Sequence, residues 1–131
     1  MRKLTLPILL ILTQLAFAQG KGAAPHELNR WFPLGAEYKI HSGGTAYSEM
    51  PTKKDSALTV TFRDEPARQV FEQIGPDAKQ VCDDVQGNRV REKKGVYCSY
   101  TARLENPKNP HYQCWIGVDL RSGESTVRVS C

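Results

Sequence analysis

Cysteine usage constrains this chain more than any other feature of its sequence. All of the cysteines fall in the C-terminal half of the 131-residue chain, at Cys82, Cys98, Cys114 and Cys131. An even number of cysteines in a short exported chain indicates disulfides rather than free thiols. The sequence has no Cys-x-x-Cys pair, and its histidines lack the spacing of zinc ligands. We therefore expect two structural disulfides, no metal site, no cofactor and no redox function.

The N-terminus predicts export across a membrane. Arg2 and Lys3 precede an apolar run from Leu4 to Leu12, and the small-residue pattern Ala16-Phe17-Ala18 follows, which is typical of a cleavable signal peptide. The apolar run is too short for a membrane-spanning helix, which needs about 20 residues. We expect a periplasmic or secreted protein, of bacterial origin from the style of the signal, with no membrane span after cleavage. The predicted parts are a signal peptide over 1–18, a flexible leader over 19–30 and a single domain over 31–131.

The charge balance argues against nucleic acid as a partner. The predicted signal peptide contains two of the 18 basic residues and none of the 14 acidic ones, which leaves a net charge of +2. A protein that binds nucleic acid through its phosphates usually carries a much stronger positive charge.

Hydrophobic periodicity predicts an α+β fold. Alternation of apolar and polar residues indicates strands at 36–41 and 57–62, and two hairpins over 88–101 and 112–131. Between them, Ala67, Val70, Phe71 and Ile74 recur at helical spacing behind an expected N-cap at Asp64. We expect one helix packed on a twisted antiparallel sheet of about five strands, whose order the sequence leaves open.

The last hairpin predicts the disulfide pairing. If Ser122-Gly123 forms its two-residue turn, Val118 lies opposite Val127 and Cys114 lies opposite Cys131. Opposed residues in an antiparallel pair are close enough for a disulfide. The predicted bridges are therefore Cys114–Cys131 and, by elimination, Cys82–Cys98.

Motifs for catalysis are missing from the sequence. His41 and Ser42 are adjacent, but neighbouring residues on a strand point to opposite faces, and no nucleophile elbow, phosphate loop or dinucleotide fingerprint is present. A small periplasmic or secreted hydrolase stays open as an alternative, with His41, His111 and Asp119 as its best available parts. A structural component of the cell envelope is a further alternative.

Two long loops on a stapled scaffold favour a binding protein. The predicted loops, 42–56 and 103–111, connect strands of the sheet, and loops on rigid scaffolds are where binding is usually placed. Trp115 lies on the strand face opposite the aliphatic residues, where it is either an exposed interface anchor or covered by another segment. We expect a non-enzymatic binding protein, such as an inhibitor or an immunity-type protein, that acts on another protein. The candidate binding residues are Tyr47, Glu49, Met50, Trp115 and Arg128.

Overall fold

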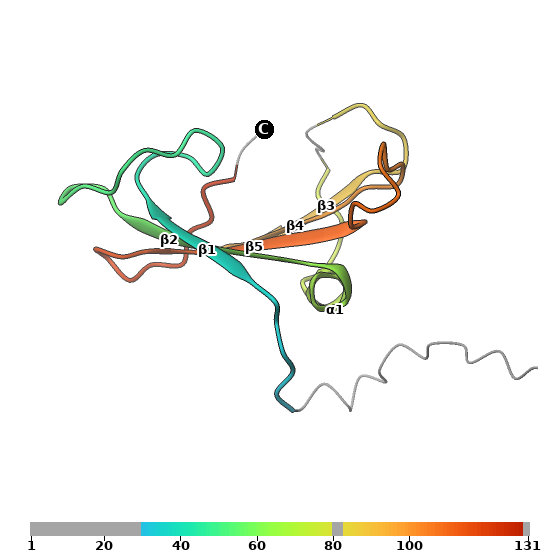
Figure 1. Cartoon of the computed structure of the whole chain (residues 1–131), viewed down its shortest axis with the longest axis horizontal. Coiled ribbons are helices and arrows are strands. Elements are labelled where there is room, and N and C mark those ends of the chain that lie inside the picture. Colours follow the sequence, from blue (N-terminus) through green and yellow to red (C-terminus); the bar gives the residue numbers. More distant parts are fainter. Residues whose placement is uncertain (1–29, 80–82, 130–131) are drawn as a thin grey trace, which may run out of the picture. The chain divides into compact units, whose positions relative to one another are not determined.

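The computed structural model describes residues 30–79 and 83–129. The fold described here is that of the compact unit Pro33–Cys131. It consists of an open antiparallel sheet and one helix (Figure 1), which confirms the predicted fold class. The sheet order is β1-β2-β5-β4-β3. In chain order the elements are β1 Glu37–His41, β2 Ala57–Arg63, α1 Asp64–Gln73, β3 Arg89–Lys93, β4 Val96–Tyr100 and β5 Tyr112–Asp119.

The helix begins without the predicted cap. The N-cap residue is Arg63, which makes no side-chain capping bond, and Asp64 is already the first helical residue. Strand β2 runs directly into α1, so the change of direction falls on Asp64, which takes a φ of 58°. Aspartate tolerates this left-handed conformation better than most residues. The acidic side chains of Asp64 and Glu65 favour the first turn through the helix dipole instead.

The core lies between α1 and one face of the sheet. Ala67 and Phe71, from the apolar stripe of the helix, are buried against Phe62 of β2 and the paired cysteines of β4 and β5. Tyr112 of β5 closes the cluster with its ring edge-on to Phe71, at 5.4 Å between ring centroids. The predicted helical stripe thus makes the contacts expected of it.

One disulfide joins β4 to β5. Cys98 and Cys114 are directly opposite each other, with Cα atoms 4.1 Å apart, and are bonded. Because each sulfur forms only one disulfide, the predicted bridges Cys82–Cys98 and Cys114–Cys131 are both wrong. The prediction placed Cys131, in the segment after β5, opposite Cys114. In the structure, β4 pairs with β5, and Cys98 of β4 lies opposite Cys114. Cys82 and Cys131 lie outside the described residues.

The turn after β5 is longer than predicted. Val118 bridges to Ser125 rather than to Val127, and the N–H of Asp119 donates to the carbonyl of Glu124 at 2.9 Å. The Asp119 carboxylate also accepts two backbone N–H groups of the turn, at 2.9 and 3.0 Å. These bonds widen the turn and shift the pairing by two residues. Residues 125–129 consequently form no regular strand, contrary to the prediction.

This C-terminal segment crosses the sheet on the face opposite α1. The N–H of Thr126 donates to the carbonyl of Gly117 at 3.0 Å. A Cβ atom on Gly117 would lie 2.0 Å from the Thr126 oxygen, so only glycine permits this approach. Gly117 points away from the face of Cys114 because strand residues alternate in direction.

Candidate functional site

The loop of residues 42–56, which joins β1 to β2, is held in a defined shape. At its base Ser42 and Glu49 exchange two backbone hydrogen bonds, at 3.1 and 3.2 Å. The Ser42 hydroxyl donates to the carbonyl of Met50 at 2.9 Å, and the Lys39 ammonium donates to the Ser48 hydroxyl at 2.9 Å. We call residues 42–56 the anchored loop.

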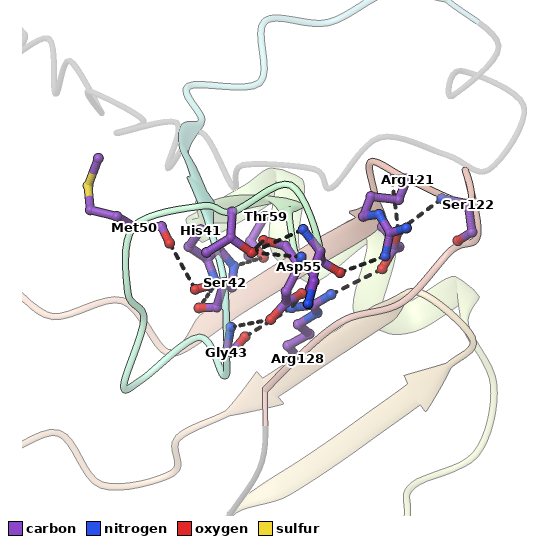
Figure 2. A network of polar contacts seen from close by, with 12 residues as sticks. His41, Ser42, Gly43, Met50, Asp55, Thr59, Arg121, Ser122 and Arg128 are labelled. Atoms are coloured by element: carbon purple, nitrogen blue, oxygen red, sulfur yellow. Dashed lines mark hydrogen bonds and ion pairs between the residues drawn. The ribbon is translucent and has the colours of Figure 1, made fainter.

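Asp55 and Arg128 fix the anchored loop to the C-terminal segment (Figure 2). The Asp55 carboxylate accepts the N–H of Gly43 at 2.9 Å and the Arg128 guanidinium at 2.5 Å. The same guanidinium donates to Asp119 at 3.1 Å, and the Arg128 carbonyl accepts the N–H of Thr45 at 2.9 Å. Three separate segments, the loop, the end of β5 and residues around 128, therefore meet in one polar network.

The electrostatics of this network keep both carboxylates charged. The backbone N–H of Gly43 and then the Arg128 guanidinium lower the pKa of Asp55. The backbone N–H groups of Ser122 and Arg121 lower the pKa of Asp119, with Arg128 adding a smaller effect. Both groups are stabilised in the ionised form, which is the form that holds Arg128.

The buried side chain of His41 connects the start of the anchored loop to β2. Its side chain is only 2% exposed, with Nδ1 at 3.2 Å from the Ser42 carbonyl and Nε2 at 2.9 Å from the Thr59 hydroxyl. A carbonyl oxygen can only accept, so Nδ1 is the donor in the contact with Ser42. This buried imidazole therefore has a structural role, because its contacts help to hold Ser42 at the base of the anchored loop.

The three residues proposed for a hydrolase do not come together. His41 and Asp119 lie in one row across the sheet, both paired with Ala57, but Asp119 is bound to Arg128. His111 precedes the opposite end of β5, which is roughly 23 Å away at the usual rise of a strand. There it bonds the Thr101 carbonyl at 2.6 Å.

The loop candidates do come together. Tyr47 and Met50 are 91% and 82% exposed, and Glu49 between them also faces solvent. All three lie on the anchored loop, and its base is fixed by the bonds of Ser42 and Asp55. The structure thus presents two large apolar side chains to solvent on a constrained backbone.

Trp115 and Arg128 have different surroundings from the loop residues. Trp115 is half-buried, and its ring packs against Tyr97 with 5.7 Å between centroids. It lines a cavity of about 510 Å³ together with Lys39, Thr45 and Gln113. The Arg128 guanidinium donates hydrogen bonds to Asp55 and Asp119, so we assign Arg128 to positioning the anchored loop rather than to contact with a partner.

Two residues that hold the anchored loop, Asp55 and Lys39, were not among the residues that the sequence analysis selected.

The second predicted loop, 103–111, borders a different cavity. This cavity of about 560 Å³ lies between the loop and residues 83–88, with Asp83, Asn88 and Arg103 among its lining residues. Asn88 connects the two sides of the cavity, because its side chain donates to Asp83 at 2.9 Å and accepts the N–H of Ala102 at 2.8 Å.

Neither metal ligands nor membrane helices are found within residues 30–79 and 83–129. No group of three or more His, Cys, Asp or Glu residues in these ranges could hold a metal ion. The one helix that they contain is not long and apolar enough to cross a membrane. Comparison of the whole chain with protein-family profiles, with curated proteins and with solved structures gives no significant match.

Proposed function

We propose that this is an exported, non-enzymatic binding protein that attaches to another protein through Tyr47 and Met50. The observation that carries this proposal is the contrast within the anchored loop. Its base is fixed by backbone and side-chain bonds, while these two side chains stand 91% and 82% exposed.

The physical argument rests on the free energy of association. A flexible loop loses conformational entropy when it binds, and a loop held in shape beforehand loses less. Tyrosine is also one of the side chains that most often dominate binding energy in protein interfaces. A constrained loop with a protruding Tyr47 and Met50 is suited to enter a concave site on a partner, which is why we favour an inhibitor or an immunity-type protein.

The disulfide agrees with the expected compartment. The Cys98–Cys114 bond is consistent with an oxidising environment outside the cytoplasm. The predicted signal peptide, residues 1–18, lies outside the described residues. Export to the periplasm or the medium is therefore supported by the N-terminal sequence and by the disulfide.

Affinity capture with matched variants tests the proposal. Oxidised protein is immobilised in three forms: wild type, the double variant Tyr47→Ala/Met50→Ala, and the control Val85→Ala/Leu120→Ala. Val85 and Leu120 are also exposed apolar residues but lie outside the anchored loop. Envelope and secreted extracts of the source cells are passed over each column, and bound proteins are identified by mass spectrometry.

We expect a stoichiometric partner on the wild-type and control columns and its loss from the loop variant. Titration of the purified partner should then show at least a tenfold weaker affinity for each single loop variant, which is about 1.4 kcal/mol. Equal capture by all three columns, or no specific capture by any, contradicts the proposal.

A further inference from the structure

The outer edge of β1 is open. Ser42 exchanges both of its backbone bonds with Glu49, so its N–H and C=O point away from β2. Backbone groups alternate in direction along a strand, so those of Tyr38 and Ile40 point the same way. Within the part of the chain that the structure describes, neither residue makes a backbone hydrogen bond on that side.

The opposite edge of the sheet is covered. There the Val90 carbonyl of β3 accepts the N–H of Ala78 at 2.7 Å. The Asp77 carboxylate pairs with Arg89 and Arg91 of the same strand, each at 2.7 Å. Open edges are usually blocked in this manner because they are templates for pairing with another chain. The two charged side chains of β1 that could protect this edge make contacts within their own chain: Glu37 pairs with Arg63 of β2 at 3.7 Å, and Lys39 is bound to Ser48 and to the carbonyl of Thr45.

An apolar surface adjoins the open edge. Helix α1 covers the face around Phe62, but the other end of the same face stays partly bare. Tyr38 is 74% exposed and Ile40 is 49% exposed. Their neighbours across the sheet on this face are Leu58, Val60, Ile116 and Val118.

We propose that the open edge of β1 binds β1 of a second copy of this chain, in antiparallel register about a two-fold axis at Tyr38. In this register Tyr38 and its counterpart in the second copy face each other, and their free N–H and C=O groups form a hydrogen-bonded pair. In the same register Ile40 lies opposite Ala36 of the second copy. The free N–H and C=O groups of Ile40 then bond with those of Ala36.

Charge complementarity selects this register. Glu37 lies opposite Lys39 of the second copy, and the two-fold axis makes the same attraction twice. A shift of the register by one position on each strand would place Lys39 opposite itself, which is repulsive. The result is one continuous sheet built from two five-stranded sheets, with the two Tyr38 rings in contact on the apolar face. This assembly does not depend on the function proposed for the anchored loop.

Sedimentation equilibrium of the exported, oxidised protein tests the pairing. We expect a concentration-dependent dimer for wild type. The single variants Glu37→Lys and Lys39→Glu should each dissociate about tenfold more readily, because each creates two like-charge pairs. The double variant Glu37→Lys/Lys39→Glu restores opposite charges in both pairs and should restore the wild-type dissociation constant.

A second pair of variants guards against indirect effects, since Lys39 also holds the anchored loop. Tyr38→Asp places two negative charges together at the axis and should weaken the dimer at least tenfold. Tyr47→Asp alters a still more exposed tyrosine that lies away from β1, and this variant should leave the dimer unchanged. Thermal melts of each variant verify that the monomer fold is retained.

Several outcomes overturn the proposal. A wild-type protein that stays monomeric at millimolar concentration has no such assembly. A dimer that persists in Tyr38→Asp uses a different surface. A double charge variant that dissociates as readily as the single variants excludes the Glu37–Lys39 register.

Discussion

Asp55 and Arg128 form an ion pair at 2.5 Å although 73 residues separate them in the chain. The pair joins the anchored loop to the C-terminal segment, and Asp55 also receives the N–H of Gly43. Asp55→Ala removes both bonds. We expect backbone amides of residues 42–50 to exchange with solvent roughly tenfold faster, because opening the loop no longer breaks them.

Hydrogen exchange followed by mass spectrometry measures this change. The matched control is Asp84→Ala, an exposed acidic residue outside the network, which should leave exchange in the loop unaltered. Equal protection of the loop in wild type and Asp55→Ala would show that the ion pair has no part in holding it.

Stability should depend on pH through a different carboxylate. Hydrogen bonds from Arg89 and Arg91 lower the pKa of Asp77 from 3.8 to about 2. A carboxyl with a lower pKa in the folded state stabilises the protein fully above its unfolded pKa, and this stabilisation is lost as pH falls through the folded pKa. We expect the free energy of unfolding to fall between about pH 4 and pH 2.

Urea unfolding at pH 6, 4 and 2.5 measures that dependence. Asp77→Asn removes the titrating group, so this variant should show a shallower decline across the same interval. A variant that declines as steeply as wild type would mean that other carboxylates account for the whole effect.

The disulfide should contribute strongly to stability. Cys98 and Cys114 are 16 residues apart, and a loop of that size corresponds to about 3 kcal/mol through the entropy of the unfolded chain. The double variant Cys98→Ala/Cys114→Ala should lose about this much in denaturant unfolding. Peptide mapping without reduction should recover Cys98 linked to Cys114. Recovery of Cys114 linked to Cys131 would contradict the Cys98–Cys114 bond.

Gly117 should be intolerant of any side chain. A methyl group there would lie 2.0 Å from the carbonyl oxygen of Thr126, which is backbone and cannot turn aside. We expect Gly117→Ala to cost about 2–4 kcal/mol, because the C-terminal segment must move away from β5. Gly44→Ala is the control, since its methyl group would meet the Arg128 carbonyl at an ordinary 3.7 Å. Thermal unfolding of both variants separates the two outcomes.

Much of the fold could be predicted because its signals are local. The alternation of Leu58, Val60 and Phe62 identified β2, and the helical spacing of Ala67 and Phe71 identified α1. The position of β5 between β2 and β4 had no local signal, because the residues of β5 that pair with β2 lie 50 or more positions further along the chain. Because the sequence did not show that β4 lies beside β5, the prediction missed the pairing of Cys98 with Cys114.

The candidate site divides in the same way. Tyr47 and Met50 could be chosen in advance because they are large residues in a long predicted loop. Asp55 could not, because in the run Lys53-Lys54-Asp55 it resembles an ordinary solvated charge. Its role depends on Arg128, and only the tertiary structure brings that guanidinium to it.

The distance in sequence between Asp55 and Arg128 also has a consequence for the timing of biosynthesis. Arg128 lies 73 positions after Asp55, and a ribosome adds about 5–20 residues per second, so Arg128 is added roughly 4–15 s after Asp55. Throughout that interval the nascent chain already contains Tyr47 and Met50 but lacks the arginine that ties their loop down. The contact between Asp55 and Arg128 can therefore form only after synthesis has reached Arg128, so this attachment of the anchored loop belongs to a late stage in the formation of the fold.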